Sequence, residues 1–501
     1  MRYLVVFSIT PVQAFIAKAR KLRDFYVSSR ILSYLASVGF DSVKERLYPS
    51  ANSASVPNKF VFTIDVNSVE EVKNEMAKIE AKIQDEWLKL ADIAKVPRDI
   101  VDDYWQYSWA AVLYKDGEYK NAHSKVQSLL AATKLKPRKI RKTQKGEKCP
   151  LCGENTVWHN DFGTDKKEKL CGVCAIKRKL PEVSIPVDHK LRSELANIKF
   201  DSTTRISAYK YIEANGLSEE VDKLHEGNDD KLPNKQRYYA LLLMDGDKMG
   251  DLVNTKSDHK EHLALSEKLD QFCEKIKKIE ISKYAGELIY AGGDDVCAIL
   301  SLDCAIETAR KIRDSYEDIV TKTETSESDK KPTSISAAIL IAHHKEPLRE
   351  VIRDAHKLLD SVAKEKAGRD ALAIKLKKRS GGDRELYFKW DADNNKFVGE
   401  KLFDSLNEVK NALFDNTLSS SLVYRLAQLK EAISVEGITD KQILKLFEYE
   451  VAHSIGKENA EINAKRLAGI CFAGGSFNPE AAVIARFLAP EKENNKTEDN
   501  K

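Results

Sequence analysis

Apolar runs and amphipathic segments alternate over the first 115 residues of the chain. Residues 3–9, 59–66 and 108–114 are short apolar runs bounded by polar residues, a pattern that predicts β-strands. Between these runs, apolar side chains recur at every third or fourth position. This spacing predicts one helix from residue 10 to the high thirties and another over 68–95. The pattern therefore indicates a unit built from strand–helix–strand connections.

The clearest pattern lies between residues 237 and 390. It begins with an uninterrupted apolar run at 238–244, which is typical of a strand buried on both faces. The first six elements of this stretch have the order strand, helix, strand, strand, helix, strand, which is the ferredoxin-like split unit, and a further helix and strand come after them. The predicted strands are 238–244, 287–291, 296–300, 334–342 and 371–376, and the predicted helices are 259–280, 305–319 and 347–366.

The other segments carry weaker patterns. Residues 116–148 are polar, 180–236 have little periodicity and several prolines, and 400–488 are helical by spacing. The predicted fold class is α+β. We expect a first domain at 1–115, an insert and connector at 116–236, a second domain at 237–390, a C-terminal helical domain at 391–490 and a disordered tail at 491–501.

Composition narrows the class of protein. The chain has 501 residues, 42% hydrophobic and 32% charged, which is typical of a globular protein of about three domains. Its net charge of +4 excludes a strongly basic, histone-like protein. No apolar run reaches the roughly 18 residues that a membrane-spanning helix needs, and the N-terminus lacks the pattern of a signal peptide. We therefore expect a cytoplasmic protein without membrane contact.

Four of the eight cysteines form two Cys-x-x-Cys pairs, Cys149 with Cys152 and Cys171 with Cys174. Four thiolates at this spacing favour a tetrahedral Zn²⁺ site. All four ligand positions are filled, so we expect a structural zinc rather than a catalytic one. The alternative is two unrelated redox pairs.

Acidic residues and glycines gather at two places in the second domain. Asp245, Gly246 and Asp247 end the apolar run, and Gly292-Gly293-Asp294-Asp295 joins two adjacent strands. In a split unit, strands one and three can lie side by side, which would bring these carboxylates together. Carboxylates suit Mg²⁺ or Mn²⁺, and two such ions could activate a ribose hydroxyl and stabilise a pyrophosphate leaving group. The glycines would let a triphosphate approach the backbone. The alternative is an ordinary turn, because Gly and Asp are common turn residues.

These motifs resemble the palm domain of nucleotidyl cyclases, GGDEF diguanylate cyclases and the large, polymerase-like subunit of Cmr-type, type III CRISPR effectors. Three features favour the last family: its palm start, its cysteine pairs between two palms, and its phosphate-binding segment. The matching residues are Tyr-Ala-Gly-Gly-Asp-Asp at 290–295, the opening at 7–16 with 19–24, the four paired cysteines, and 363–372 with 377–382.

The resemblance implies two palm domains and conversion of ATP to cyclic 3′–5′ oligoadenylate when the effector complex holds target RNA. The implied partners are ATP, other effector subunits, and guide and target RNA through the complex. Asp245, Asp294 and Asp295 would hold two Mg²⁺ or Mn²⁺ ions as catalytic residues. The nucleotide-binding candidates are Gly246, Asp247, Gly292, Gly293, Lys364, Lys366 and Arg369. Asp247 could instead be a turn residue, and the three cations could belong to a solvated helix end.

The first domain has no Gly-Gly-Asp-Asp, and its Asp65 ends a strand alone. We therefore expect a non-catalytic partner that could help to hold a second ATP, with Ser8 and Gln13 near a shared cleft. The family often begins with an HD nuclease domain, but no His-Asp dipeptide occurs in the sequence, so no such nuclease is expected.

Three alternatives stay open. The chain could be a non-catalytic scaffold that organises the effector complex, or a stand-alone nucleotide cyclase. The basic stretch at 134–148 could be a solvated linker, or it could contact RNA backbone or a neighbouring subunit.

Overall fold

The computed structural model describes most of the chain. The described residues are 1–50, 56–115, 117–135, 146–162, 168–186, 189–195, 201–217, 232–279, 281, 286–324, 333–379, 382–391, 396–455 and 459–489. Most of the basic stretch at 134–148 and the predicted tail at 491–501 lie outside these residues. No helix among the described residues combines the length and apolarity needed to cross a membrane.

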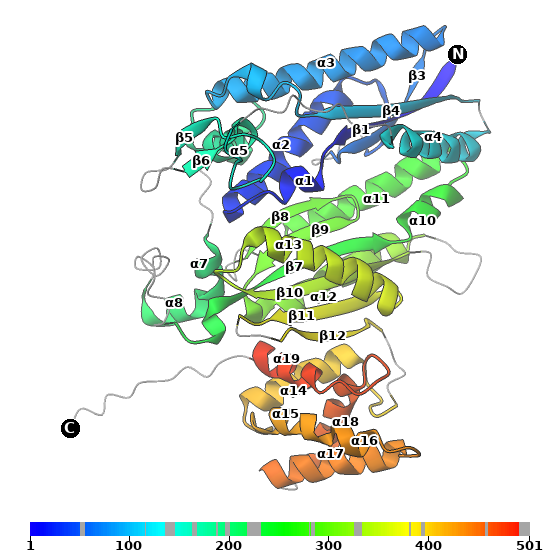
Figure 1. Cartoon of the computed structure of the whole chain (residues 1–501). Helices are drawn as coiled ribbons and strands as arrows, with labels where there is room; N and C mark the ends of the chain where they lie inside the picture. The colour runs from blue at the N-terminus through cyan, green and yellow to red at the C-terminus, as the bar shows by residue number, and fades with distance from the viewer. Residues whose placement is uncertain are drawn as a thin grey trace.

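The first unit is a four-stranded antiparallel sheet in the order β2-β3-β1-β4. This is the order of a ferredoxin-like split unit, with β1 in the middle (Figure 1). Alternate residues of β1 face two cores: Val5 and Phe7 pack against α2 and α3, whereas Leu4 and Val6 pack against α4. The elements are β1 (Arg2–Thr10), α1 (Gln13–Ile16), α2 (Leu22–Asp41), β2 (Glu45–Tyr48), β3 (Lys59–Asp65), α3 (Val69–Ile93), β4 (Gln106–Leu113) and α4 (Tyr119–Lys134).

The second unit contains a six-stranded sheet in the order β12-β11-β10-β7-β9-β8. Its β10-β7-β9-β8 part repeats the split order of the first sheet, and β7 lies beside β9, as the sequence predicts. The elements are β7 (Tyr238–Asp247), α10 (Met249–Thr255), α11 (His259–Lys277), β8 (Glu287–Gly292), β9 (Asp295–Leu300), α12 (Leu302–Tyr316), β10 (Ser334–His343), α13 (Leu348–Lys357), β11 (Ala371–Lys377) and β12 (Arg384–Lys389).

Strand β7 is apolar at every position from Tyr238 to Met244 because both of its faces are covered. Ala240 and Leu242 face the core formed with α11 and α12, whereas Leu241 and Leu243 face α13. Phe25, from α2 of the first unit, packs in this second core. The two units are therefore joined by apolar contact as well as by the chain.

The C-terminal helices lie beyond the β12 edge of the second sheet, whereas part of the middle segment lies beside α2 of the first unit (Figure 1). The C-terminal helices share a core with this sheet, and α19 packs on β12. They are α14 (Leu402–Phe414), α15 (Leu422–Arg425), α16 (Leu429–Ile433), α17 (Asp440–Ile455), α18 (Ala460–Cys471) and α19 (Glu480–Leu488). The middle segment contributes β5 (His159–Phe162), β6 (Glu168–Leu170), α5 (Gly172–Lys179), α6 (Arg192–Leu195), α7 (Thr203–Ser207) and α8 (Tyr209–Asn215).

Two sequence predictions about helices need correction. The helix predicted from residue 10 to the high thirties is broken into α1 and α2, because Lys21 is extended and the Asp24 carboxylate accepts its backbone N–H. The predicted helix at 347–366 is α-helical only to Lys357 and continues as a π-helical segment, η7 (Leu358–Lys366). A π-helical segment of this kind often lies at a functional site.

Several elements were missed by the sequence pattern, among them β2, β12 and α4. Strands β2 and β12 are short edge strands, which leave little periodicity to detect. Helix α4 was placed in the polar connector, but its residues Ala122, Val126 and Leu130 pack on the first sheet. The first unit therefore extends to Lys134 rather than to residue 115.

Candidate functional site

The acidic residues of the second sheet meet at one end of β7 and β9. Met244 pairs with Val296 across these strands, so Asp245 lies next to Asp295 in the register. The side chains of these two aspartates are within hydrogen-bonding reach of each other. Gly293, with φ +65°, forms the tight turn that carries Asp294 beside them.

Asp294 approaches the backbone of β7 so closely that only glycine fits at position 246. A Cβ on Gly246 would lie 2.6 Å from Asp294 Oδ2. Gly246 therefore has a steric role beside Asp294, and its contact with nucleotide stays a prediction. The structure thus brings together the three carboxylates that the sequence nominated as metal ligands.

The negative charges of the three carboxylates repel one another. Burial, and then the charge of Asp245, raise the pKa of Asp294 to about 7. Desolvation, and then the charges of Asp294 and Asp245, also raise the pKa of Asp295. Lys364 Nζ forms an ion pair with Asp245 and offsets part of this negative charge. Such a group of carboxylates is stabilised by a further cation.

Asp247 differs from its neighbours. Its carboxylate accepts hydrogen bonds from Ser334 Oγ at 2.7 Å, Ser336 Oγ at 2.9 Å and the backbone N–H of Asp370 at 2.9 Å. The side chain is buried, and these donors satisfy it. The contacts favour the turn-residue alternative over a nucleotide contact for Asp247.

The predicted phosphate-binding cations divide into two groups. Lys364 lies on η7 against Asp245 and reaches the acidic site. Lys366 points elsewhere, since its ammonium lies 4.5 Å from the Tyr387 ring centroid and 3.5 Å from Glu385. Arg369 adopts a left-handed backbone, with φ +66°, directly before β11. Only Lys364 of the three is in contact with a nominated metal ligand.

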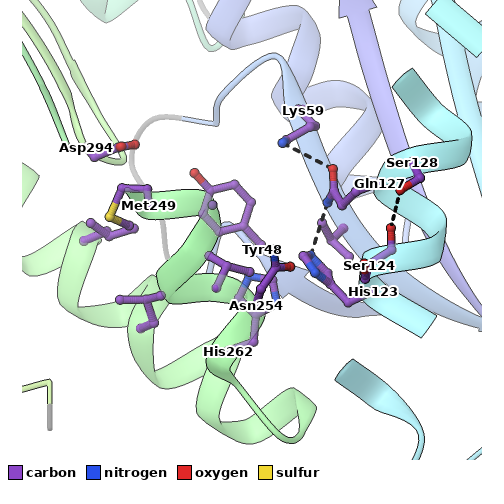
Figure 2. Close-up of a pocket in the computed structure, with 15 residues that line it drawn as sticks. Tyr48, Lys59, His123, Ser124, Gln127, Ser128, Met249, Asn254, His262 and Asp294 are labelled. Carbon is purple, nitrogen blue, oxygen red and sulfur yellow. Dashed lines mark hydrogen bonds between the residues drawn. The ribbon is translucent and has the colours of Figure 1, made fainter. Parts of the chain in front are cut away.

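A cavity of about 370 Å³ lies between the first unit and the second, and Asp294 forms part of its wall (Figure 2). The second unit contributes α10 and α11, including Met249, Asn254 and His262. The first unit contributes Tyr48 and Lys59. The volume is in the range typical of small-ligand sites.

The sequence pattern did not predict the residues that the first unit contributes to the cavity. Its residues are Tyr48, Lys59 and Val61 from the sheet and His123, Ser124, Gln127 and Ser128 from α4. None of them belongs to a motif, so only the packing of two distant segments reveals them. The predicted residues Ser8 and Gln13 are not among the residues that line this cavity.

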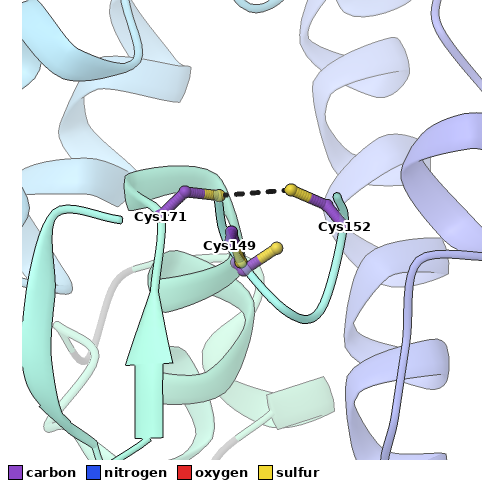
Figure 3. A group of neighbouring side chains, drawn as sticks. Cys149, Cys152 and Cys171 are labelled. Carbon is purple, nitrogen blue, oxygen red and sulfur yellow. Dashed lines mark hydrogen bonds between the residues drawn. The ribbon is translucent and has the colours of Figure 1, made fainter. Parts of the chain in front are cut away.

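The four paired cysteines form a second cluster, shown in part in Figure 3. Their sulfur atoms all lie within 4.8 Å of one another, and Cys152 Sγ is 3.7 Å from Cys171 Sγ. Tetrahedral Zn²⁺ with bonds of about 2.3 Å separates its sulfur ligands by about 3.8 Å. The geometry therefore fits a zinc ion with four thiolate ligands.

The cysteine cluster is anchored to the first unit. Cys171 and Cys174 belong to the start of α5, which packs on α2. From the same helix, Arg178 forms a buried ion pair of 2.7 Å with Asp24, and Lys177 donates to the carbonyl oxygen of Phe15. The cluster thus holds the segment between the two sheets against the first one.

Comparison with known proteins agrees with this arrangement. The second palm domain family of Cas10/Cmr2 matches residues 238–373, and the CRISPR-associated protein Cmr2 N-terminal family matches residues 4–51. A curated relative, CRISPR system Cmr subunit Cmr2 of Pyrococcus furiosus, is 25% identical over an alignment that covers 75% of this chain. The chain spans 62% of that relative's length.

Solved structures share the fold. A chain of the type III-B Cmr-beta complex in its apo state matches with a TM-score of 0.70 at 13% identity, over 98% of this chain and 82% of that chain. A chain of the Csm1–Csm4 cassette in complex with cA4 matches with a TM-score of 0.56 at 12% identity, over 98% of this chain and 70% of that chain. The resemblance predicted from the sequence is therefore confirmed: the chain is similar to Cmr2, with a match to the Cas10/Cmr2 second palm domain family at residues 238–373 and to the Cmr2 N-terminal family at residues 4–51.

Proposed function

We propose that the chain is the nucleotidyltransferase subunit of an RNA-guided type III CRISPR effector and converts ATP to cyclic oligoadenylate. The observation that supports this most is the convergence of Asp245, Asp294 and Asp295 beside a cavity between two palm-like units. A solved structural neighbour was determined in complex with cA4, and another in complex with one ATP.

The residues present fit divalent metal ions. Three carboxylates crowd together with only Lys364 in ion-pair contact among the described cations, so hard cations would relieve their repulsion. Asp245, Asp294 and Asp295 would hold two Mg²⁺ or Mn²⁺ ions. Bound there, the ions would supply charge stabilisation for the attacking hydroxyl and the departing pyrophosphate.

The chain itself positions the reactants. The turn at Gly292 and Gly293 presents no side chain of its own to an incoming triphosphate. Lys364 can exchange its contact with Asp245 for a phosphate oxygen once the carboxylates are neutralised. Among the described residues, no histidine forms a hydrogen bond or ion pair with the three aspartates, so substrate orientation would carry much of the catalysis.

The proposed partners come from the relatives. One structural neighbour is Cmr-beta bound to cognate target RNA, and several are Csm1–Csm4 subcomplexes. We infer that this chain likewise works with other effector subunits and with guide and target RNA through the complex. We also propose the predicted division into domains, with α4 moved into the first one.

We further propose that Cys149, Cys152, Cys171 and Cys174 hold a structural Zn²⁺. Four buried sulfur ligands leave no open position for water, which is typical of a structural rather than a catalytic zinc.

The test of the main proposal uses the assembled complex with Mn²⁺, ATP and target RNA, with products identified by mass spectrometry. We expect cyclic oligoadenylate from the wild type and none from D294N/D295N, with complex assembly unchanged. Absence of any oligoadenylate from the wild type would favour the scaffold alternative. Product formed by the purified chain from GTP without RNA would favour a stand-alone cyclase.

A further inference from the structure

Lys59 belongs to the first unit, and the acidic residues of the second unit do not explain why its side chain lies in the cavity. It begins β3 in the first sheet, yet its side chain lines the same cavity as Asp294 (Figure 2). Its ammonium donates to Gln127 Oε1 at a distance of 3.5 Å, which is long for a hydrogen bond. No carboxylate of the described residues lies within ion-pair distance of it.

The Lys59 side chain is half-buried, and no ion pair with a described carboxylate neutralises its ammonium. Burial lowers the pKa of Lys59, and the charge of Asp294 acts against this effect. Enclosing a cation without an anion costs free energy, and proteins usually avoid this unless a ligand supplies the missing charge. A ligand that neutralises Lys59 must be anionic and must enter the cavity.

Tyr48 adds a second polar group on the same side. Its hydroxyl lies against the catalytic turn, since a Cβ on Gly293 would lie 3.0 Å from Tyr48 Oη. In Figure 2 the Tyr48 hydroxyl and the Lys59 ammonium both point toward the side of the cavity that holds Asp294. An ammonium and a hydroxyl that face the carboxylates proposed to hold metal ions would form a cradle for a phosphate.

We infer that Lys59, a residue of the first palm-like unit, binds a phosphate group of the nucleoside triphosphate that reacts at Asp245, Asp294 and Asp295, with the Tyr48 hydroxyl as a second donor. This inference rests on the proposed function. Lys59 is then a substrate-binding residue supplied across the interface between the two units. The first unit takes part in the reaction through this cation rather than through a metal site of its own.

The alternative is that Lys59 only neutralises Asp294 in the folded protein. The distance argues against it, because no ion pair within 4.0 Å joins Lys59 to any described carboxylate, whereas Lys364 does pair with Asp245. If Lys59 only neutralised Asp294, its substitution would affect the binding of nucleotides equally, whatever their number of phosphates. Binding measurements with different nucleotides can therefore distinguish the two roles.

The experiment measures binding of α,β-methylene-ATP, AMP and adenosine to the full chain by calorimetry, with Mn²⁺. The methylene bridge blocks transfer, so binding alone is observed. We expect K59Q to lower the affinity for the triphosphate analogue roughly tenfold or more, because a charge-assisted hydrogen bond is lost. The affinity for adenosine should stay within about twofold of the wild-type value. K59R should recover most of the affinity because it keeps the charge.

The control is K125Q. Lys125 is an exposed residue of α4 that does not line the cavity, and its substitution should leave all three affinities unchanged. The inference would be overturned if K59Q bound the triphosphate analogue as tightly as the wild type does. It would also be overturned if K59Q weakened the binding of the analogue and of adenosine equally. Neither result would overturn the proposed function. Failure of the wild type to bind any nucleotide would overturn the proposed function as well.

Discussion

Asp245 and Asp247 lie two positions apart in the sequence and serve different purposes in this protein. Asp247 is buried and bonded to Ser334, Ser336 and the Asp370 backbone, so it holds β7 to its neighbours. Asp245 and Asp294 face other carboxylates, and burial together with Asp245 raises the pKa of Asp294. Repulsion of this kind lowers stability and is typical of functional sites.

This contrast predicts opposite effects of two matched substitutions. D247N should lower the free energy of unfolding by roughly 1–3 kcal/mol, because the amide cannot accept all of the hydrogen bonds. D294N should keep or raise the free energy of unfolding by up to about 1 kcal/mol, because it removes a repelling charge, while it abolishes nucleotide transfer. Urea unfolding and product analysis measure both effects. If D294N proved the more destabilising of the two, Asp294 would have a structural role.

At the scale of elements, α4 and α11 meet through a cluster of aromatic rings. Tyr119 Oη hydrogen-bonds to His262 Nδ1, and the rings of His123 and His262 lie edge to face with centroids 5.1 Å apart. Burial lowers the pKa of His123 to about 4 and that of His262 to about 3. The nearby cations Lys59 and Lys256 act in the same direction on His262. Both histidines are therefore neutral in the folded protein at pH 7.

The two histidines predict a loss of stability in mild acid. In the unfolded chain they take up protons near pH 6.5, but in the folded protein only near 4 and 3. Their contribution is thus fully present above about pH 6.5 and declines as pH falls toward these values, by up to about 1.4 kcal/mol per pH unit for each histidine. Urea unfolding of wild type and H262Q at pH 7.5 and 5.5 measures the contribution of His262 to the free energy of unfolding.

We expect the wild type to lose more stability than H262Q over that interval, by about 1 kcal/mol. The carboxylates with raised pKa values contribute a change in stability of the opposite sign. This contribution is the same in both proteins, so it cancels when the loss in H262Q is subtracted from the loss in the wild type. An equal loss in both proteins would contradict the assignment of a buried neutral His262.

At the scale of the whole molecule, the cysteine cluster lies where the chain passes between the two sheets. Helix α5 carries two of the cysteines and also Lys177 and Arg178, which reach Phe15 and Asp24 of the first unit. Removing a metal from the cluster would therefore loosen the first unit as well as the cluster itself.

Zinc analysis tests this arrangement. We expect about one zinc per chain in the wild type and none in C152S/C174S. Strong chelators should lower the midpoint of thermal unfolding by at least about 5 °C, since loss of a few kcal/mol shifts the midpoint by that amount in domains of this size. The double variant C297A/C471A, at two buried cysteines outside the cluster, should keep its zinc. A wild-type protein without zinc and indifferent to chelators would overturn the assignment.

The sequence by itself determined five of the six strands of the second sheet and the identity of its acidic residues. Solid apolar runs such as Tyr238–Met244 report strands covered on both faces, and the Gly-Gly-Asp-Asp turn and the cysteine spacing are local signals. These features depend on residues close together in the chain, so the pattern of the chain contains them.

Only the tertiary structure decided how the two units face each other. The break between α1 and α2 depends on Asp24, whose partner Arg178 lies far along the chain, and α4 is recognisable as part of the first unit only by its contact with the sheet. Lys59 and Tyr48 belong to no motif, and they meet Asp294 because two split units pack together. Such contacts join residues that are distant in sequence, and periodicity carries no information about them.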